Sequence, residues 1–303
     1  MKKISKKQIY NVCALLIVII LSLFAVIPLQ SAKADNSDWM AELDDERAIN
    51  TLSIPGTHDS GALHSFGDVF GKCQTLSVGE QMKIGVRFLD VRLQLVGNEL
   101  KVVHSIADQM TSFNDTLTDM ITFLRENPTE FLIVSFKEDA DPKRSDIDFA
   151  AALEQQLLSY DEVSRSTTLP KTVGEARGKL HVIARYSNAT IGVPCGRGWI
   201  DDDSFELSGM YIQDNYTVGS SGEKFLDVTN ALAIAAKCEY TLVLNYASCY
   251  ISPSFPPIYA GIPAHDVNYW LAKTLTLTDD PCGVLLCDFI TSDLADLIIR
   301  RNF

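Results

Sequence analysis

The sequence lacks the marks of a multidomain, repetitive or zinc-binding protein. No Gly/Ser-rich or Pro-rich linker and no internal repeat divides its 303 residues. One large domain is therefore predicted, a size that α/β barrels commonly reach undivided. No Cys-x-x-Cys pair occurs among the seven cysteines, which disfavours a zinc site. Six of these cysteines lie beyond residue 34, and their spacing does not decide which of them pair.

Positive charge is also scarce. The chain has 26 Lys and Arg residues against 39 Asp and Glu residues, a formal net charge of −13. Five lysines and no acid lie in residues 1–34, so residues 35–303 carry −18. A surface this acidic argues against nucleic acid as a partner and against bulk attraction to anionic lipid.

One apolar stretch, Val12–Ile27, follows four lysines and precedes the small-residue pattern Ser31-Ala32-Lys33-Ala34. This arrangement predicts a secretory signal peptide over residues 1–34, cleavage after Ala34 and a secreted domain over residues 35–303. An uncleaved membrane anchor is the alternative, because the stretch approaches the length of about 20 residues that spans a bilayer.

Short β-branched segments alternate with helical patterns, which is typical of a parallel sheet and, with eight segments, of a closed α/β barrel. We therefore predict a single-domain barrel of the (β/α)8 TIM type. The predicted strands are Leu52–Pro55, Val86–Leu95, Leu100–Val103, Phe131–Phe136, Leu180–Ala184, Met210–Ile212, Tyr240–Leu244 and Val284–Cys287. The predicted helices are Thr116–Glu126, Ile147–Leu158, Lys224–Lys237, Ala264–Leu275 and Asp293–Arg301.

The second and third predicted strands are too close together for a crossover, and the Gly-Asn pair between them indicates a hairpin. A loop of Gly97, Asn98 and Glu99 predicts that Arg92 faces His104 directly. Facing residues of an antiparallel pair lie about 5 Å apart. A loop of a different length would shift this register.

Polar residues follow almost every predicted strand, and the carboxyl ends of barrel strands meet at one mouth. They are His58, Asp59, Asp90, Arg92, His104, Lys137, Glu138, Arg185, Asp214, Tyr216, Asn245, Tyr246 and Asp288. Two imidazoles suit acid and base catalysis near neutral pH, and arginine matches phosphate with two donors. No carboxylate-rich cage for Ca²⁺ or Mg²⁺ is evident. The set predicts metal-independent phosphoryl transfer.

Several segments resemble those of the bacterial phosphatidylinositol-specific phospholipases C in order and spacing, over most of residues 35–303. They are Ser-Ile-Pro-Gly-Thr-His-Asp-Ser (53–60), Gly-Val-Arg-Phe-Leu-Asp-Val-Arg (85–92), Val-Val-His (102–104), Phe-Leu-Arg-Glu-Asn-Pro-Thr-Glu-Phe-Leu-Ile-Val-Ser-Phe-Lys-Glu (123–138), Gly-Glu-Ala-Arg-Gly-Lys (174–179), Ile-Gln-Asp-Asn-Tyr (212–216) and Gly-Val-Leu-Leu-Cys-Asp-Phe (283–289).

The resemblance implies a distorted α/β barrel that cuts phosphatidylinositol, and in many members glycosylphosphatidylinositol, into diacylglycerol and a cyclic inositol phosphate. It implies no cofactor and a monomer that contacts membranes transiently. The implied catalytic residues are His58 as general base, Asp288 orienting it, His104 as general acid, Asp59 assisting His104, and Arg92 binding phosphate. The implied inositol-binding residues are Lys137, Arg185, Asp214 and Tyr216.

One position departs from the family pattern, because Ser105 follows His104 where relatives usually have glycine. Exposed aromatic and aliphatic residues on two loops are predicted to enter the lipid interface. They are Phe66, Val69 and Phe70 on the first loop and Phe255, Ile258 and Tyr259 on the second.

Two other functions remain open at the level of sequence. A metal-dependent phosphodiesterase of the glycerophosphodiester or sphingomyelinase D kind also uses a barrel with two histidines, but it needs a Glu/Asp cluster beside the first histidine, and Arg92 occupies the place where its metal would lie. A secreted lipid- or inositol-binding module without turnover would lack one acid–base residue, whereas His58 and His104 are both present.

Overall fold

The computed structural model describes residues 35–64, 71–105, 107–252 and 260–303. Residues 35–303 form one compact unit. The predicted signal peptide and the aromatic residues of the two predicted lipid-contacting loops lie outside the described ranges. Within those ranges, no helix combines the length and the apolar character that crossing a membrane requires.

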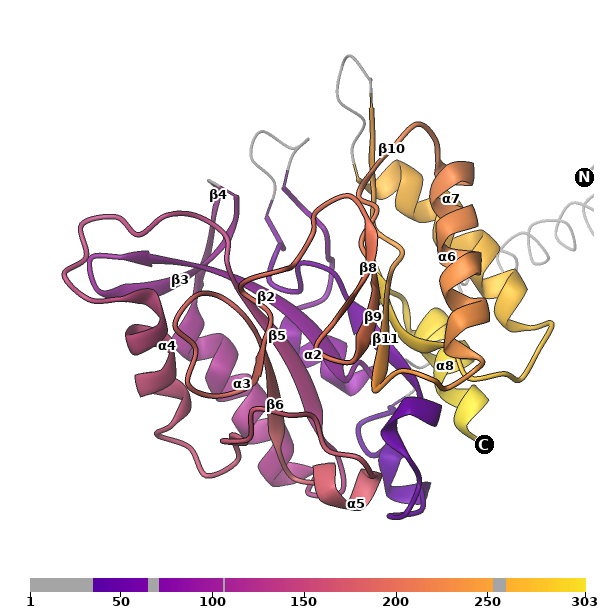
Figure 1. The fold of residues 1–303 in the computed structure, drawn as a ribbon, viewed down its shortest axis with the longest axis horizontal. Coiled ribbons are helices and arrows are strands. Elements are labelled where there is room, and N and C mark those ends of the chain that lie inside the picture. The colour runs from indigo at the N-terminus through magenta and orange to yellow at the C-terminus, as the bar shows by residue number, and fades with distance from the viewer. Residues whose placement is uncertain (1–34, 65–70, 106, 253–259) are drawn as a thin grey trace, which may run out of the picture. The chain divides into compact units, whose positions relative to one another are not determined.

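A curled sheet forms the centre of this unit, with strand order β7-β6-β5-β2-β1-β13-β11-β9-β8 (Figure 1). Every pairing along this path is parallel except that of β8 with β9. The strands are β1 Ser53–Thr57, β2 Phe88–Val96, β3 Glu99–His104, β4 Ala107–Ser112, β5 Leu132–Glu138, β6 Leu180–Arg185, β7 Val193–Pro194, β8 Ser204–Leu207, β9 Met210–Gln213, β10 Thr217–Val218, β11 Leu242–Tyr246, β12 Tyr250–Ile251 and β13 Gly283–Cys287.

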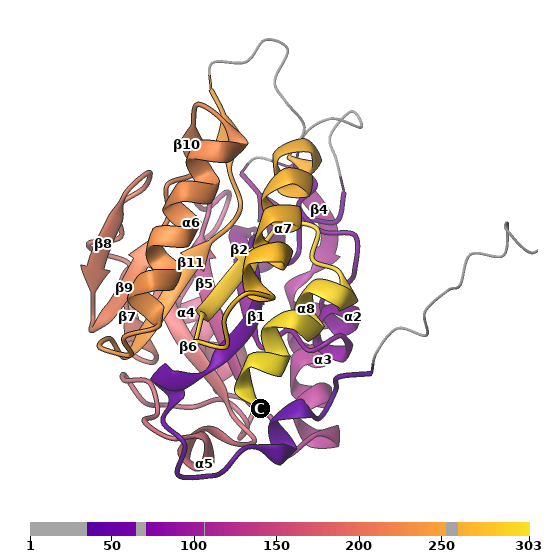
Figure 2. The same cartoon turned by 90° about the vertical axis from the view of Figure 1, so that its right-hand side faces the viewer.

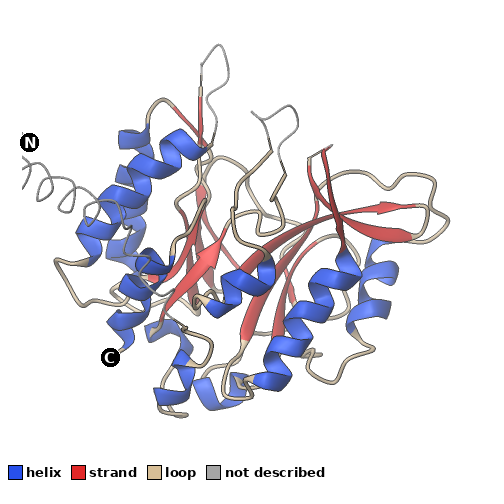
Figure 3. Cartoon of the chain, turned by 180° about the vertical axis from the view of Figure 1, so that it is seen from behind, coloured by secondary structure: helices blue, strands red, loops and turns tan. Residues whose placement is uncertain are grey.

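Helices cover the outer face of the sheet (Figure 3). Side-chain oxygens at their first turns, such as Ser112 before α3 and Thr291 before α8, accept backbone N–H groups that would otherwise lack partners. Helix α6 packs against α7, and α7 against α8 (Figure 2). The α-helices are α2 Val78–Lys83, α3 Phe113–Glu126, α4 Phe149–Leu157, α5 Val173–Ala176, α6 Ser221–Ala235, α7 Gly261–Leu275 and α8 Ser292–Ile299. Short 3-10 helices are η1 Trp39–Glu42, η2 Ile49–Thr51 and η3 Arg300–Asn302.

Alternate residues of each central strand enter two separate apolar clusters. Phe88 and Leu286 belong to one cluster, whereas their neighbours Leu89 and Leu285 pack in the other with side chains of the covering helices. Burying each such side chain contributes roughly 1.5–3 kcal/mol. The strands are therefore held on both faces, and their carboxyl ends form a rigid frame for polar residues.

The prediction of an α/β barrel is confirmed, and all eight predicted strands exist. The barrel is distorted, because β3 does not join the parallel path: it pairs with β2 and β4 as an antiparallel extension (Figure 1). The sequence did not reveal β4, β7, β8, β10 and β12, nor the short helices α2 and α5. Three of these strands have two residues, and β4 is a mostly exposed, polar segment without an apolar alternation.

The predicted facing of Arg92 and His104 is wrong by one residue. The observed pairs run from Leu93 with Val102 to Val96 with Glu99, so the turn consists of Gly97 and Asn98 alone. Both residues adopt positive φ, 57° and 68°, as a two-residue type I′ hairpin turn requires. Glu99 therefore pairs within the hairpin, and His104 approaches the mouth of the barrel from beyond the last β2–β3 pair.

Candidate active site

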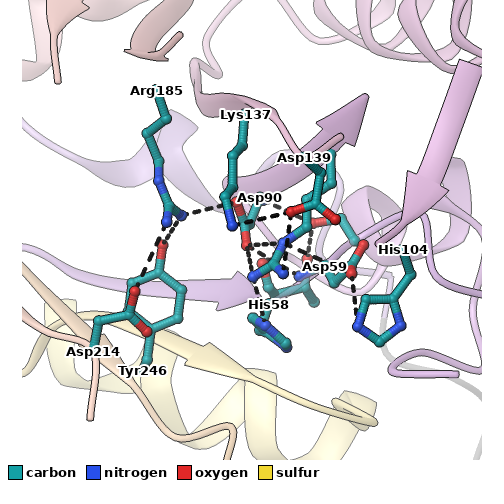
Figure 4. A network of polar contacts seen from close by, with 12 residues as sticks. His58, Asp59, Asp90, His104, Lys137, Asp139, Arg185, Asp214 and Tyr246 are labelled. Carbon is teal, nitrogen blue, oxygen red and sulfur yellow. Dashed lines mark hydrogen bonds and ion pairs between the residues drawn. The ribbon is translucent and has the colours of Figure 1, made fainter. Parts of the chain in front are cut away.

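The carboxyl ends of the parallel strands bring the predicted polar residues to one mouth (Figure 4). His58 and Asp59 follow β1, Arg92 lies in β2, and Asp288 follows β13. Asp59 has a φ of 40°, which turns the chain sharply after the strand. The next residue is tied back to β2, because the Ser60 N–H donates to the Asp90 carbonyl oxygen at 2.7 Å. The turn therefore presents an imidazole and a carboxylate from adjacent positions.

His58 is held from both sides of its ring. Its Nδ1 lies 2.8 Å from Asp288 Oδ1, and both side chains are only 1% exposed. Its Nε2 lies 2.8 Å from Arg92 Nη2. A guanidinium cannot accept a hydrogen bond, so Nε2 accepts here and the ring proton lies on Nδ1, facing the carboxylate. This assignment follows from the hydrogen-bond network and leaves Nε2 with the lone pair that a general base needs.

Gln74 fastens the two strands that carry this pair. Its Nε2 donates to the carbonyl oxygens of His58 and Cys287, both at 2.8 Å. Strands β1 and β13 also pair directly in parallel, from Ser53 with Gly283 to Thr57 with Cys287. The distance between base and carboxylate is thus fixed by backbone as well as by side chains.

Three carboxylates surround the Arg92 guanidinium. Asp90 Oδ2 lies 3.2 Å from Nη2, Asp59 Oδ2 lies 3.7 Å from Nε, and Asp139 Oδ1 lies 3.7 Å from Nη1. Burial alone would lower the pKa of Arg92, but the three acids outweigh it and raise that pKa. Burial also opposes the charge of Asp90, yet Arg92 and Arg185 together lower the pKa of Asp90.

The sequence therefore missed a cluster of acids at this point. Asp59, Asp90 and Asp139 do gather, and a cation of the chain, Arg92, lies among them. Asp90 is fully buried between Arg92 and Arg185. Its carboxylate therefore offsets the positive charge of Arg92 and Arg185 and fixes the position of the Arg92 guanidinium.

Asp59 and His104 form the second imidazole–carboxylate pair, with 3.7 Å between Oδ2 and Nε2. Burial raises the pKa of Asp59 to about 7, although Arg92 and His58 oppose the shift. Burial and then Arg92 lower the pKa of His104, against a backbone hydrogen bond with Gly71. The pKa of Asp59 thus rises past the ordinary value of an imidazole while that of His104 falls, so the two groups share one proton near neutral pH.

Ser105, at the position where the resemblance implies glycine, adopts a conformation that favours glycine. Its φ is 54°, a left-handed conformation that costs a side-chain-bearing residue about 1–2 kcal/mol. Its N–H donates to Asp139 Oδ2 at 2.6 Å. The turn thus links the His104 strand to the acids around Arg92.

The four predicted inositol-binding residues line one cavity of about 200 Å³, together with Arg92, Asp201 and Asp202. They are Lys137, Arg185, Asp214 and Tyr216. The volume lies below the roughly 300–1,000 Å³ of drug-sized pockets. The cavity therefore suits a single ring bearing hydroxyl groups. Lys137 Nζ pairs with Asp139 Oδ1 at 3.0 Å, and Arg185 Nη2 lies 3.8 Å from Asp214 Oδ2.

A support layer that the sequence did not reveal holds these residues. Trp199 lies against Arg185, with 3.7 Å between the guanidinium carbon and the ring centroid, and its Nε1 donates to Asp214 Oδ2 at 2.9 Å. Asp202 Oδ1 accepts the backbone N–H groups of Tyr216 and Thr217. Asp139 had a visible signal, since it follows Lys137 and Glu138 at the end of a strand. Trp199 and Asp202 lie in a loop with no comparable pattern.

Lys224 lies below the cavity and is fully buried. Its Nζ donates to Gln213 Oε1 at 2.8 Å and to the Asn215 carbonyl oxygen at 2.6 Å, on either side of Asp214. Burial lowers the pKa of Lys224 to about 8, against the attraction of Asp214. A buried ammonium therefore fixes the segment that presents Asp214 and Tyr216.

Two sets of side chains bring donors that a metal ion could use close together. They are His58, Cys73 and Asp288 in one set and Asp59, Cys73 and His104 in the other. The resemblance already pairs His58 with Asp288 and His104 with Asp59, whereas nothing in the sequence places Cys73 beside them.

A parallel α/β barrel with two imidazole–carboxylate pairs and an arginine at its mouth defines the class of barrel phosphodiesterases. Within this class, the family described as PI-PLC X 1 matches residues 46–163. Residues 46–163 are therefore similar to the X domain of the phosphatidylinositol-specific phospholipase C family.

Two curated relatives bear the name 1-phosphatidylinositol phosphodiesterase. That of Listeria monocytogenes is 26% identical over 277 residues, covering 87% of this chain and 84% of the relative. That of Staphylococcus aureus strain Newman is 28% identical over 206 residues, covering 59% of this chain and 64% of the relative.

Solved structures agree on the fold. A phosphatidylinositol-specific phospholipase C from S. aureus, from work on the modulation of its membrane binding, aligns with a TM-score of 0.80 at 24% identity. It covers 89% of this chain and 98% of its own. The L. monocytogenes enzyme aligns with a TM-score of 0.74 at 22% identity, covering 89% and 99%.

Proposed function

We propose that this protein is a phosphatidylinositol-specific phospholipase C that releases diacylglycerol and inositol 1,2-cyclic phosphate. The observation that carries the proposal is the position of Arg92. Its guanidinium lies 2.8 Å from His58 Nε2 and 3.7 Å from Asp59 Oδ2, and that same carboxylate oxygen lies 3.7 Å from His104 Nε2. A phosphate bound to Arg92 would lie between a base and an acid.

The reaction needs a proton to leave one oxygen and another to reach a second oxygen. His58 Nε2 removes the proton of the inositol 2-hydroxyl, and Asp288 stabilises the imidazolium that forms. The 2-oxygen bonds to phosphorus while the bond from phosphorus to the glyceryl oxygen breaks. The His104–Asp59 pair gives its proton to that departing oxygen, and Arg92 balances the charge on the non-bridging phosphate oxygens.

The cavity beside Arg92 accounts for the choice of headgroup. Lys137 and Arg185 can donate to ring hydroxyls, Asp214 can accept from them, and Tyr216 offers a flat face. Headgroups without hydroxyls would displace water from these side chains without replacing its hydrogen bonds, which a site built on hydrogen bonds penalises strongly. Choline and ethanolamine lipids are therefore poor substrates in this proposal.

The metal-dependent phosphodiesterase is the less favoured function. Arg92 supplies a positive charge among Asp59, Asp90 and Asp139, at the point where such an enzyme would bind its ion. We propose a lyase without a resident metal. Both imidazoles have carboxylate partners, which favours turnover over a binding module.

We also propose that residues 1–34 direct export and are removed after Ala34, so that the enzyme acts outside the cell as a monomer on membrane or micelle surfaces. The lysine-rich start, the apolar stretch and the Ala-x-Ala site support this. Mass spectrometry of the exported protein tests it: a mature chain beginning at Asp35 is expected, and retention of the first 34 residues would contradict it.

Cleavage of phosphatidylinositol and phosphatidylcholine vesicles in the presence of a chelator tests the main proposal. We expect a phosphorus resonance of a cyclic phosphodiester from phosphatidylinositol and no product from phosphatidylcholine. Loss of activity in chelator would favour the metal-dependent alternative. Inositol binding without product would favour the binding module.

A further inference from the structure

The Cys73 sulfur lies within 4.8 Å of donor atoms of both imidazole–carboxylate pairs. Cys73 is a free cysteine, 1% exposed. Its backbone is fixed, because its N–H donates to the Ala62 carbonyl oxygen and its own carbonyl oxygen accepts from the Phe289 N–H. Neither the proposed reaction nor the resemblance gives this thiol a role.

The thiol belongs to two possible donor sets, and only one of them is available to a ligand. In the set of His58, Cys73 and Asp288, both ring nitrogens of His58 already have partners, Asp288 and Arg92. In the set of Asp59, Cys73 and His104, the donor atoms lie within 4.8 Å of one another. Both carboxylate oxygens of Asp59 are buried and lack a hydrogen-bond partner.

The separation of the carboxylate and the imidazole in the second set fits a metal site. Zinc binds nitrogen and oxygen at about 2.0–2.2 Å and sulfur at about 2.3 Å in tetrahedral geometry, which separates its ligands by roughly 3.3–3.8 Å. Asp59 Oδ2 and His104 Nε2 are 3.7 Å apart. His104 is 21% exposed, so an ion has access from solvent.

The donor types select the kind of ion. Sulfur, imidazole and a single carboxylate suit a soft or borderline cation, whereas Ca²⁺ and Mg²⁺ require several oxygen ligands. Arg92 Nε lies 3.7 Å from Asp59 Oδ2 and opposes a second positive charge, but Asp90 and Asp139 partly neutralise it. We therefore expect the ion to bind this site with moderate affinity and reversibly.

We propose that Asp59, Cys73 and His104 form an inhibitory site for a soft divalent cation of the Zn²⁺ type, with water as the fourth ligand. As the sulfur–metal bond forms, the Cys73 thiol releases its proton to solvent. The ion occupies the His104 lone pair and the Asp59 carboxylate, so the pair can no longer deliver a proton to the leaving group. This inference rests on the proposed function for its effect on catalysis, but not for the binding site itself.

Binding is tested first, without any substrate. Co²⁺ is titrated into the purified protein, and the near-ultraviolet absorption of a thiolate–cobalt bond is recorded while Zn²⁺ competes. We expect one equivalent in the wild type, its loss in Cys73→Ser and Cys73→Ala, and no change in Cys282→Ser. Cys282 is the matched control, since it is also free and 1% exposed and lies before β13, at the opposite end of that strand from Asp288.

Inhibition is tested next with phosphatidylinositol vesicles and buffered Zn²⁺. Zn²⁺ should inhibit the wild type, chelator should restore activity, and equal Ca²⁺ or Mg²⁺ should have no effect. Removal of the thiol should raise the half-inhibiting Zn²⁺ concentration at least about 10-fold. If Zn²⁺ does not change wild-type activity and no thiolate–cobalt absorption is seen, the inference is overturned. The proposed lyase activity is not affected by that result. Activity that requires Zn²⁺ overturns the inhibitory role. Absorption without lipid cleavage supports the site and contradicts the lyase.

Discussion

Replacing His104 with alanine separates the proposed acid from the rest of the site. The imidazole is part-exposed, and its ion pair with Asp59 is long, at 3.7 Å. Asp59 is buried, but its pKa of about 7 lets it become neutral once the imidazole is gone, so the fold should tolerate the change. Any large loss of activity would therefore report on chemistry and not on unfolding.

The size of the loss depends on the leaving group. General acid catalysis contributes roughly 10²–10⁴ in rate, or about 3–5 kcal/mol of barrier. Asp59 remains in the variant, and its pKa of about 7 lets it keep a proton near neutrality. We therefore expect a loss near the lower end, about 10²–10³ in kcat, for phosphatidylinositol. A phenyl inositol phosphate needs little protonation and should lose about 10-fold or less.

The assay compares kcat on both substrates for the wild type and the variant, with urea unfolding as a measure of stability. His265→Ala is the matched control, because this histidine is 82% exposed and its described ion pair is with Asp266, its neighbour in sequence. It should behave as the wild type on both substrates. Equal losses on the lipid and the phenyl ester in His104→Ala would refute the acid role.

Three further predictions concern single side chains. Arg92→Lys should lower kcat/KM for phosphatidylinositol about 10²-fold or more, while the free energy of unfolding in urea changes little. The reason is that an ammonium keeps the charge but cannot make the two-pronged contact with phosphate. A near-normal kcat/KM would contradict this prediction. Burial lowers the pKa of Lys224 to about 8, so the unfolded chain binds the proton more tightly than the folded chain. Between pH 8 and 10.5, the unfolding free energy of the wild type should therefore rise by up to about 3 kcal/mol relative to that of Lys224→Met. A difference that stays constant with pH would contradict the burial of the charge. Ser105→Gly should raise the unfolding free energy by up to about 1 kcal/mol, because its φ of 54° favours glycine; a clear loss of stability in urea would contradict the argument from strain.

The sequence predicted the parts of the site that lie at strand ends. Because parallel strands share one direction, a polar residue after each apolar run must reach the same mouth, and this rule brings His58, Arg92, Lys137 and Asp288 together. The strands and helices that were predicted also occur in the predicted order. Most of the motifs that carry the resemblance include these strand ends, whereas residues 174–179 lie in α5 and before β6.

The strand-end rule does not identify site residues that lie in loops. Trp199 and Asp202 have no periodic pattern around them, and their contacts with Asp214 and Tyr216 depend on tertiary packing. The hairpin register failed for a local reason, because Gly97 and Asn98 accept positive φ and close the turn with one residue fewer. No Cys-x-x-Cys pair marks Cys73 as a metal ligand in the sequence, whereas the fold places it beside two histidines.

The pairing of β1 with β13 has a consequence for biosynthesis. His58 and Asp288 are 230 positions apart, and Asp288 follows the last strand of the sheet. A nascent chain therefore has no oriented base until almost all of it has left the ribosome and folded. Incomplete or unfolded chains would therefore not cleave the lipids of the cell that makes them.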